Sequence, residues 1–354
     1  MPDPPRLTRS PCHGQGGGGM GNAQQGEAGQ QAHGLGVVIV AFRSADVIAD
    51  CIDSLFEADA PPERVVLCDN DSPDESAAIA RARAEAHGLS SAEAAPGDAP
   101  PLARLVILRI GANRGYAGGA NPGLAMLAAD PAIDLFWVLN PDCRVDPRAP
   151  SLFRAAAARS PAFSLMGGRI RYIEPPCAIQ SDGGRVSRWT GICRNVNQGL
   201  LPQQAQPPDP ASLDFISGAS MIASRAFLAQ AGPMREDYFL YYEEVDWAAR
   251  RGALPLLLVP EALVHHHGGT VIGSGSPTRK ATPFALWFNN RNRMRFMRRF
   301  HPLALPLAWA NSLARAAKLL LTGDRAGAGA AIRGLLGLAP PASVAKRLPA
   351  HALD

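Results

Sequence analysis

Two acidic clusters that follow apolar runs are the first candidates for chemistry in this sequence. Asp69 and Asp71 flank an asparagine after one run, and Asp142 follows Asn140 and a proline after another. Asp and Asn favour turns because they bond to nearby backbone, so both clusters could be simple turns. Alternatively the carboxylates hold a ligand, since a cation such as Mg²⁺ takes one or two carboxylates together with substrate phosphates.

A third acidic cluster consists of Glu243, Glu244 and Asp246, directly after the aromatic stretch 238–242. The helix macrodipole favours acids at a helix start, which would explain the cluster without any chemistry. A carboxylate beside apolar aromatic surface, however, has a raised pKa because of desolvation. That suits a general base working near neutral pH. Both interpretations stay open on these residues alone.

Clusters of glycine, histidine and arginine are the remaining candidates for functional residues. The glycine-rich segment 111–121 allows a ligand to approach the backbone closely, or is a tight connection. Its glycine spacing is not that of a dinucleotide-binding fingerprint. The histidines 265–267 follow a predicted strand, where a role as metal or phosphate ligand competes with packing. The arginine-rich run 291–299 forms either a solvated helix face or a contact with a diphosphate or an anionic membrane.

Alternating strands and helices must position these clusters. The β-branched run 37–41 is typical of a strand buried on both faces of a parallel sheet. We expect further strands at 64–68, 105–110 and 135–139, and helices at 46–57 and 74–87. This alternation predicts a doubly wound α/β sheet, in which ligands bind beyond the carboxyl ends of the strands. Asp69, Asn113 and Asp142 all fall at such ends.

The remainder of the chain has a mixed pattern. Strands are expected at 164–172, 215–223 and 256–259, and helices at 224–230, 245–251, 309–321 and 326–338, with a basic helical stretch from about 283. The first 33 residues are rich in Gly, Gln, Pro and His, which predicts a disordered tail. The predicted organisation is a tail over 1–33, a main α/β domain over 34–275 and a basic, amphipathic helical extension over 276–354.

The composition excludes several classes of protein. With 354 residues, 47% hydrophobic and 19% charged, the chain is neither wholly disordered nor a small disulfide scaffold. Its net charge of +4 is too small to indicate binding to nucleic acid. Six cysteines form no CxxC pair, which is typical of free thiols in a reducing cytoplasm. No unbroken apolar span and no signal peptide are evident, so we expect a cytoplasmic location.

The order of the motifs resembles that of family 2 glycosyltransferases, in particular the rhamnosyltransferase-like branch that acts in bacterial cell-surface polysaccharide assembly. The motifs are VVIVAF, CDNDSPDES, GANRGYAGGAN, WVLNPDC, FISGASMIASR, DYFLYYEEVDWAARRG, VHHHGG and RNRMRFMRR. They cover residues 36–300, and eight of them in this order are far more specific than any one alone. The resemblance implies a GT-A fold, that is, a Rossmann-like mixed sheet flanked by helices. It also implies inverting, metal-dependent transfer from a dTDP- or UDP-linked sugar to a glycan or lipid-linked acceptor.

The resemblance also implies roles for single residues. The donor pocket would be formed by Asp69, Asp71, Asn113, Gly115, Tyr116 and Asn140. Mg²⁺ or Mn²⁺ would be held by Asp142, at the position of the family's DxD aspartate, together with His266 or His267. Asn140 replaces the first acid of that motif, so one carboxylate rather than two holds the ion. Glu244 stands where the family has its catalytic aspartate, so we expect Glu244 as the base, with Asp246 and Glu243 as alternatives.

Other functions would share part of this pattern. A decayed glycan- or lipid-binding module would not need the intact Asp142 and acid cluster. A nucleotidyltransferase would carry a Gly-rich phosphate loop with Lys or Arg, and residues 36–43 contain no such loop. Polysaccharide assembly usually takes place at the inner membrane face. The arginine run and the amphipathic stretch 309–321 would therefore either dock peripherally on that membrane or pack on the catalytic domain.

Overall fold

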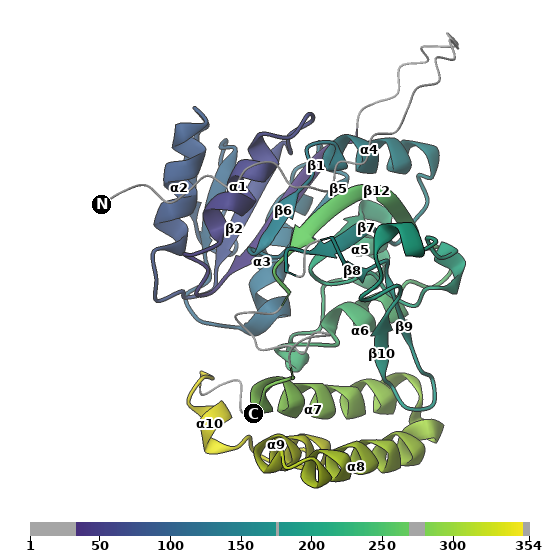
Figure 1. The fold of residues 1–354 in the computed structure, drawn as a ribbon. Helices are drawn as coiled ribbons and strands as arrows, with labels where there is room; N and C mark the ends of the chain where they lie inside the picture. Colours follow the sequence, from purple (N-terminus) through teal and green to yellow (C-terminus); the bar gives the residue numbers. More distant parts are fainter. Residues whose placement is uncertain (1–32, 175–176, 269–279, 350–354) are drawn as a thin grey trace. The chain divides into compact units, whose positions relative to one another are not determined.

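The computed structural model of the protein describes residues 33–174, 177–268 and 280–349 (Figure 1). Apart from His33, the predicted tail lies outside these residues. The first five strands form the parallel half of the main sheet, in the order β3-β4-β2-β1-β5. They are β1 (Leu35–Ala41), β2 (Arg64–Asp69), β3 (Ser91–Ala94), β4 (Leu105–Arg109) and β5 (Leu135–Leu139). Because these strands run in one direction, their carboxyl ends meet at one edge of the sheet.

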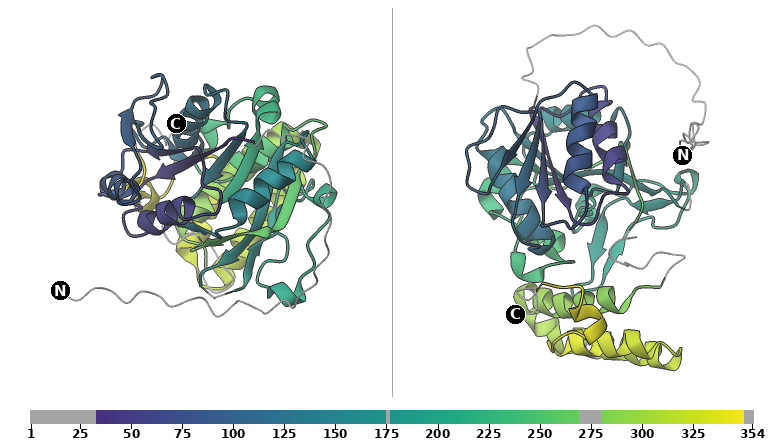
Figure 2. Two further views of the ribbon diagram at one scale, coloured as in Figure 1. Left: turned by 90° about the horizontal axis from the view of Figure 1, so that it is seen from above. Right: turned by 90° about the vertical axis from the view of Figure 1, so that its left-hand side faces the viewer.

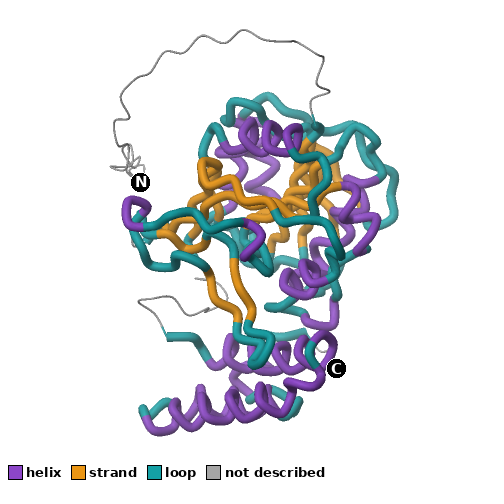
Figure 3. The backbone as a smooth tube through the Cα atoms, turned by 90° about the vertical axis from the view of Figure 1, so that its right-hand side faces the viewer, coloured by secondary structure: helices purple, strands orange, loops and turns teal. Residues whose placement is uncertain are grey.

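The other half of the sheet is mixed and continues from β5 in the order β11-β7-β12-β6, with β8 beside β7. The strands are β6 (Cys143–Val145), β7 (Leu165–Tyr172), β8 (Ile179–Ser181), β11 (Ser220–Ser224) and β12 (Leu257–His266). β11 is antiparallel to both of its neighbours, while β12 is parallel to β7 and antiparallel to β6. A separate hairpin of β9 (Gly184–Val186) and β10 (Cys193–Asn195) extends toward the C-terminal helices (Figure 3).

Helices cover both faces of the sheet (Figure 2). Alternate residues of β1 point to opposite faces, so Val37 and Ile39 pack with α1, α2 and α4, while Val38 packs with α3, α5 and α6. These helices are α1 (Ile48–Phe56), α2 (Ser76–Ala86), α3 (Gly115–Ala128), α4 (Ala149–Arg159), α5 (Arg225–Ala231) and α6 (Glu243–Ala249). The predicted α/β fold with a mixed sheet flanked by helices is therefore confirmed.

The chain ends in the helices α7 (Pro283–Phe300), α8 (Leu305–Leu321), α9 (Arg325–Leu335) and the short α10 (Ala342–Ala345). α9 packs on both α7 and α8. Among the described residues, no helix is long and apolar enough to cross a membrane. The division into domains at residues 275 and 276 stays a prediction, because it falls within 269–279, outside the described residues.

The arginine-rich run on α7 faces inward to a large extent. Arg291 and Arg293 are buried, and the Arg291 guanidinium lies 4.6 Å from the centroid of the Trp287 ring. Arg293 donates a hydrogen bond of 2.6 Å to Ser312 on α8. The sequence allowed this run to face solvent, to contact a diphosphate or a membrane, or to pack on the protein. Arg291 and Arg293 pack on the protein.

Several elements differ from the sequence predictions. The short strands β3, β6, β8, β9 and β10 were not predicted. β11 begins at Ser220 rather than at residue 215, and β12 continues to His266. The last difference places two of the three histidines within a strand rather than after it. The prediction of free thiols is confirmed for Cys51, Cys68, Cys143 and Cys193 and is wrong for Cys177, which is disulfide-bonded.

Candidate active site

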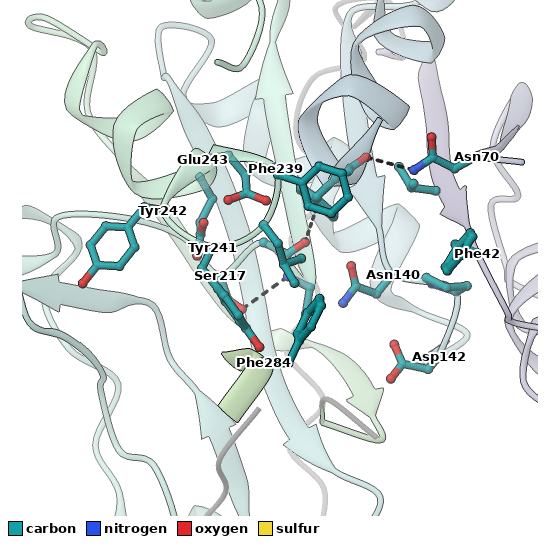
Figure 4. A pocket seen from close by; sticks show the side chains of 18 of the residues that line it. Phe42, Asn70, Asn140, Asp142, Ser217, Phe239, Tyr241, Tyr242, Glu243 and Phe284 are labelled. Carbon is teal, nitrogen blue, oxygen red and sulfur yellow. Dashed lines mark hydrogen bonds between the residues drawn. The ribbon is translucent and has the colours of Figure 1, made fainter. Parts of the chain in front are cut away.

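A cavity of about 1170 Å³ lies at the carboxyl ends of the parallel strands. It collects most of the residues that the sequence singled out: Asp71, Asn113, Gly115, Tyr116, Asn140, Asp142, Glu243, Glu244 and His266. Glu243 and Phe239 lie on one side of it, and Asn140 and Asp142 on the other (Figure 4). Asp69, Asp246 and His267 are not among the described residues that line it.

A carboxylate and an imidazole meet on one wall of the cavity. A tight turn leads from β5 into β6, and the pairing of β6 with β12 sets His266 opposite Cys143. As a result the Nε2 atom of His266 lies 3.0 Å from the Oδ1 atom of Asp142, and both side chains are buried. His267 contributes a backbone N–H that donates to the carbonyl of Asp142 at 3.3 Å. The strand register therefore distinguishes His266 from His267.

Gln180 on β8 orients this imidazole. Its Oε1 atom lies 2.8 Å from Nδ1 of His266 and can only accept, so Nδ1 carries a proton and Nε2 faces Asp142. The side-chain amide of Asn140 is 3.3 Å from the same Nε2 atom. Burial raises the pKa of Asp142, but the charge of His266 and the hydrogen bond from it outweigh this and hold the pKa below its ordinary value. Sequence reasoning missed Gln180, because no motif signals a lone glutamine.

Cys143 is the third group whose ligand atom lies close to those of Asp142 and His266, all within 4.8 Å of one another. Its thiol donates to the carbonyl of Ala219, and burial raises its pKa well above the ordinary value. A neutral thiol is a poor ligand for Mg²⁺ or Mn²⁺, which prefer oxygen ligands. The oxygen and nitrogen atoms of Asp142 and His266, together with the phosphate oxygens of a substrate, form a donor set that suits such a cation.

The acid pair Glu243 and Glu244 begins α6 on the other side of the cavity. Glu243 is only 2% exposed, and its Oε2 atom has no hydrogen-bond partner. Burial and then the charge of Glu244 raise the pKa of Glu243 well above its ordinary value. Burial also raises the pKa of Glu244, but backbone N–H groups at the start of the helix stabilise its ionised form. The two neighbouring carboxyls therefore differ in their environments.

Asp246, two residues further on, has different surroundings. It is fully buried, accepts a hydrogen bond of 3.0 Å from the Tyr238 hydroxyl and one of 2.9 Å from Arg250, and lies 3.4 Å from Arg235. These partners hold its carboxylate on the side of α6 that faces away from the cavity lining. The structure thus separates Asp246 from the two glutamates.

The segment before the acid pair has an unusual backbone. Phe239, Tyr241 and Tyr242 have φ angles of 64°, 69° and 75°, a left-handed region that side chains with a Cβ rarely adopt. Asn292 of α7 is fully buried and donates to the carbonyls of residues 238, 240 and 241 at 2.7–3.0 Å. The C-terminal helices thereby hold the loop that presents Glu243 and Glu244.

Asn70 organises the glycine-rich loop, which packs against the segment before the acid pair. Its side-chain amide donates to Asn113 Oδ1 at 3.1 Å and to the carbonyl of Gly115 at 3.0 Å, and its oxygen accepts from the backbone of Arg114. Gly115 has a φ of 73°, and a Cβ there would lie 2.2 Å from the carbonyl oxygen of Phe239, so only glycine fits.

The predicted donor residues have distinct places around this loop. Asp69 is buried, accepts a hydrogen bond from the backbone of Ser72 and forms an ion pair with Arg109, so it supports the turn rather than lining the cavity. Asp71 is exposed and lines the cavity. Tyr116 donates its hydroxyl hydrogen to the carbonyl of Gly218, which connects the glycine-rich loop to the segment beside Glu244.

A mixed sheet flanked by helices, with a cavity at the carboxyl ends of its parallel strands, is the arrangement expected of the GT-A fold. A mannosyltransferase from Pyrobaculum calidifontis has the same fold. It superposes with a TM-score of 0.51 at 16% identity, over 85% of this chain and 86% of its own. At this identity the likeness shows the fold alone. The predicted GT-A fold is confirmed.

The sequence comparisons support the predicted resemblance to a glycosyltransferase family. Residues 36–176 match the glycosyl transferase family 2 model. An N-acetylglucosaminyl-diphospho-decaprenol L-rhamnosyltransferase of Mycobacterium tuberculosis is 28% identical over 66% of this chain and 76% of its own. A low-salt glycan biosynthesis hexosyltransferase of Haloferax volcanii is 28% identical over 40% of this chain and 44% of its own. These matches confirm the predicted resemblance to rhamnosyltransferase-like glycosyltransferases of family 2.

Proposed function

We propose that the protein transfers a sugar, with inversion, from a nucleoside-diphosphate donor to a glycan or lipid-linked acceptor. The observation that carries this proposal is the presence of Asp142 with His266 and of Glu243 with Glu244 around one cavity. Glycosyl transfer needs these two functions on opposite sides of the anomeric carbon. One stabilises the departing diphosphate, and the other removes a proton from the incoming hydroxyl.

Asp142 and His266 would hold a divalent cation, Mg²⁺ or Mn²⁺, together with the donor phosphates. When bound, such a cation stabilises the negative charge that develops on the leaving diphosphate. The geometry supports this assignment because Nε2 of His266 and Oδ1 of Asp142 lie 3.0 Å apart, with Gln180 holding the other ring nitrogen. Two acceptor atoms this close need a positive charge between them, which is either a proton on the imidazole or a metal ion. The Pyrobaculum mannosyltransferase structure is a complex with GDP-mannose and Mn²⁺.

Glu244 is the base in this proposal. A base must be ionised before the reaction, and the backbone N–H groups around Glu244 favour its ionised form, whereas the more deeply buried Glu243 is favoured in its neutral form. The acceptor hydroxyl oxygen bonds to the anomeric carbon and its proton moves to Glu244. The bond from the anomeric carbon to the phosphate oxygen breaks, and the nucleoside diphosphate leaves. Attack from the face opposite the leaving group inverts the anomeric centre.

The relatives support a particular donor and acceptor. We propose rhamnose, carried by dTDP or UDP, as the donor group, because the Mycobacterium tuberculosis relative is named as a rhamnosyltransferase. The name of that relative also supports a lipid-linked diphosphate as acceptor. Asn113, Gly115, Tyr116 and Asp71 would contact the nucleoside, since they line the cavity at and near the glycine-rich loop.

The test is a transfer assay with a panel of dTDP-, UDP- and GDP-linked sugars and a short-chain polyprenyl-diphospho-N-acetylglucosamine acceptor. We expect turnover with Mg²⁺ or Mn²⁺, none with EDTA, and a product linkage of inverted configuration by NMR. Asp142→Ala should abolish transfer while the melting temperature stays close to that of the wild type. Turnover in the presence of EDTA, or by Asp142→Ala, would contradict the metal assignment. Nucleotide binding without any transfer would favour a binding module.

We also propose that α8 rests on the inner membrane surface, where a lipid-linked acceptor would be found. Leu303, just before α8, and Leu321, at its end, are 99% and 89% exposed, and Leu307, Trp309 and Leu313 are also exposed. Residues 280–349 carry twelve Lys and Arg, of which Arg315 and Lys318 on α8 are exposed. They carry one acid, Asp324, which caps α9 by accepting from the backbone of Gly327. Exposed apolar side chains among cations, with almost no acids, complement an anionic lipid surface.

Sedimentation with vesicles of phosphatidylglycerol and phosphatidylcholine tests this contact. We expect binding that weakens as salt increases, and loss of binding in Leu307→Glu/Leu313→Glu, whose positions are exposed enough for the fold to remain intact. Equal binding of this variant, or no binding by the wild type, would count against the membrane contact. Neither outcome would affect the assignment of the cavity.

A further inference from the structure

The last described residues of the chain form part of the catalytic cavity. Residues 346–349 line it, together with Phe284 and Asn289 of α7. No motif of the sequence assigned a role to this segment, which lies about two hundred residues beyond Asp142. Figure 1 shows α10, the helix directly before the segment, beside α7.

Packing holds this segment in place. Val344 of α10 is 1% exposed and belongs to an apolar cluster with Phe239, Phe284, Trp287, Phe288 and Ala330. The guanidinium of Arg347 lies 4.5 Å from the centroid of the Phe284 ring, within the range of a cation–π contact. The backbone of Arg347 also donates to the carbonyl of Val344 at 3.0 Å. Lys346 and Arg347 are therefore placed at the cavity wall by buried apolar anchors.

The same apolar cluster supports the acid pair. Phe239 stacks on Phe288 with ring centroids 5.6 Å apart, and the chain runs from Phe239 directly to Glu243. The C-terminal segment and the loop before the two glutamates thus pack on a common surface of α7. A ligand that reaches Glu244 therefore meets a wall to which the C-terminal segment contributes.

The charges around the cavity give this segment a chemical role. Among the described lining residues the acids are Asp71, Asp142, Glu243 and Glu244, and the Lys and Arg residues are Arg43, Arg194, Lys346 and Arg347. A diphosphate that enters beside four acids needs cationic partners, and half of the Lys and Arg side chains come from the C-terminal segment. Arg offers a planar fork that fits phosphate oxygens, and Lys offers a mobile point charge.

We infer that Lys346 and Arg347 bind the oxygens of a diphosphate in this cavity. The inference rests on the proposed function, because only that function brings such ligands there. Two ligands carry this chemistry: the nucleoside diphosphate of the donor and the diphosphate of a lipid-linked acceptor. In either case the C-terminal segment completes the substrate site, and a chain that ends before residue 346 lacks part of it.

The experiment compares Lys346→Ala/Arg347→Met with the wild type by calorimetry, using dTDP and UDP with Mn²⁺ in one arm and farnesyl diphosphate in the other. Methionine keeps an unbranched side chain against Phe284 while removing the charge. A lost charge-assisted hydrogen bond to phosphate lowers affinity by about 10- to 100-fold. A loss of this size for the nucleotides identifies the donor, and a loss for farnesyl diphosphate alone identifies the acceptor.

Two controls accompany this measurement. Lys346→Arg/Arg347→Lys keeps both charges and should retain most of the affinity. Arg148→Ala/Arg159→Ala removes two exposed cations at α4, outside the cavity lining, and should bind like the wild type. The inference is overturned if Lys346→Ala/Arg347→Met stays folded and binds both probes within about twofold of the wild type. If farnesyl diphosphate binding depends on the pair while no nucleotide sugar supports transfer, the proposed function fails and the diphosphate site stands.

Discussion

The two sides of the cavity are positioned in different ways. Asp142 and His266 belong to neighbouring strands, and the register of β6 on β12 brings them together through backbone pairing. Glu243 and Glu244 follow a loop of left-handed residues that the side chain of Asn292 holds from another part of the chain. The proposed metal side, Asp142 with His266, therefore depends on the sheet. The proposed base side, Glu243 with Glu244, depends on the C-terminal helices. Substitutions should affect the two sides separately.

The largest expected effect is on the reaction rate, and it distinguishes the roles of Glu244 and Asp246 on α6. Glu244→Gln should lower kcat by about 100- to 10,000-fold, because general base catalysis contributes that much, with little change in the free energy of unfolding. Asp246→Asn should instead cost about 3 kcal/mol of that free energy, because it leaves Arg250 and Arg235 facing a neutral side chain. Initial rates with saturating donor and urea unfolding measure the two quantities. A fully stable Asp246→Asn protein that lacks activity would make Asp246 the base.

A somewhat smaller effect tests how the C-terminal helices support the base side. Asn292→Ala leaves the carbonyls of residues 238, 240 and 241 without their buried donor, and we expect a loss of about 2 to 4 kcal/mol in the free energy of unfolding. The rate should fall while the affinity for Mn²⁺ with nucleotide stays unchanged, because strand pairing rather than this loop positions Asp142 and His266. Asn289→Ala, whose side chain donates to the carbonyl of Ala285 within α7, is the matched control for stability. Equal loss of metal affinity would mean that the two sides are coupled.

A third substitution addresses the metal side alone. Gln180→Leu removes the acceptor that orients His266, and outer partners of this kind typically contribute about 10- to 100-fold in metal affinity or activity. We expect weaker Mn²⁺ binding in the presence of the nucleotide and a rate that recovers at high Mn²⁺. Gln198→Leu, which removes a bond to Tyr172 on the same wall, should bind Mn²⁺ like the wild type. A rate that excess Mn²⁺ does not restore would assign Gln180 a role other than metal support.

The smallest effect concerns pH. Burial raises the pKa of Glu244, and it also raises the pKa of the neighbouring Glu243. The Tyr116 side chain lies near both carboxyls. Because the base must be ionised, kcat/KM should be constant at higher pH and fall as the pH drops through a pKa above the ordinary glutamate value of about 4.3. The profile is recorded at saturating Mn²⁺. An acid limb at or below the ordinary value would argue against a buried glutamate as the base.

The pattern of apolar residues predicted many of the strands and helices, because each of these elements is specified by residues that are close together in the sequence. The β-branched runs at β1, β2, β4 and β5 and the helical spacing of α1 correspond to elements that the structure contains. Among the strands that escaped prediction, β3 and β6 have four and three residues, too few for alternation to stand out. These short strands exist because they pair with longer neighbours. β6 nevertheless sets the place of Asp142 relative to His266.

The candidate site also has one part that the sequence predicted and another that only the folded structure revealed. The residue types and their order were enough to indicate a family 2 glycosyltransferase. Each motif is a short stretch of sequence that contains its own reactive side chains and turn-forming residues. Strand register decides which histidine faces Asp142, and helix phase decides which acids of α6 reach the cavity. Packing brings Gln180, Asn292 and residues 346–349 to the site. These properties join residues that are distant along the chain, so they arise only when the folded sheet and the C-terminal helices bring them into contact.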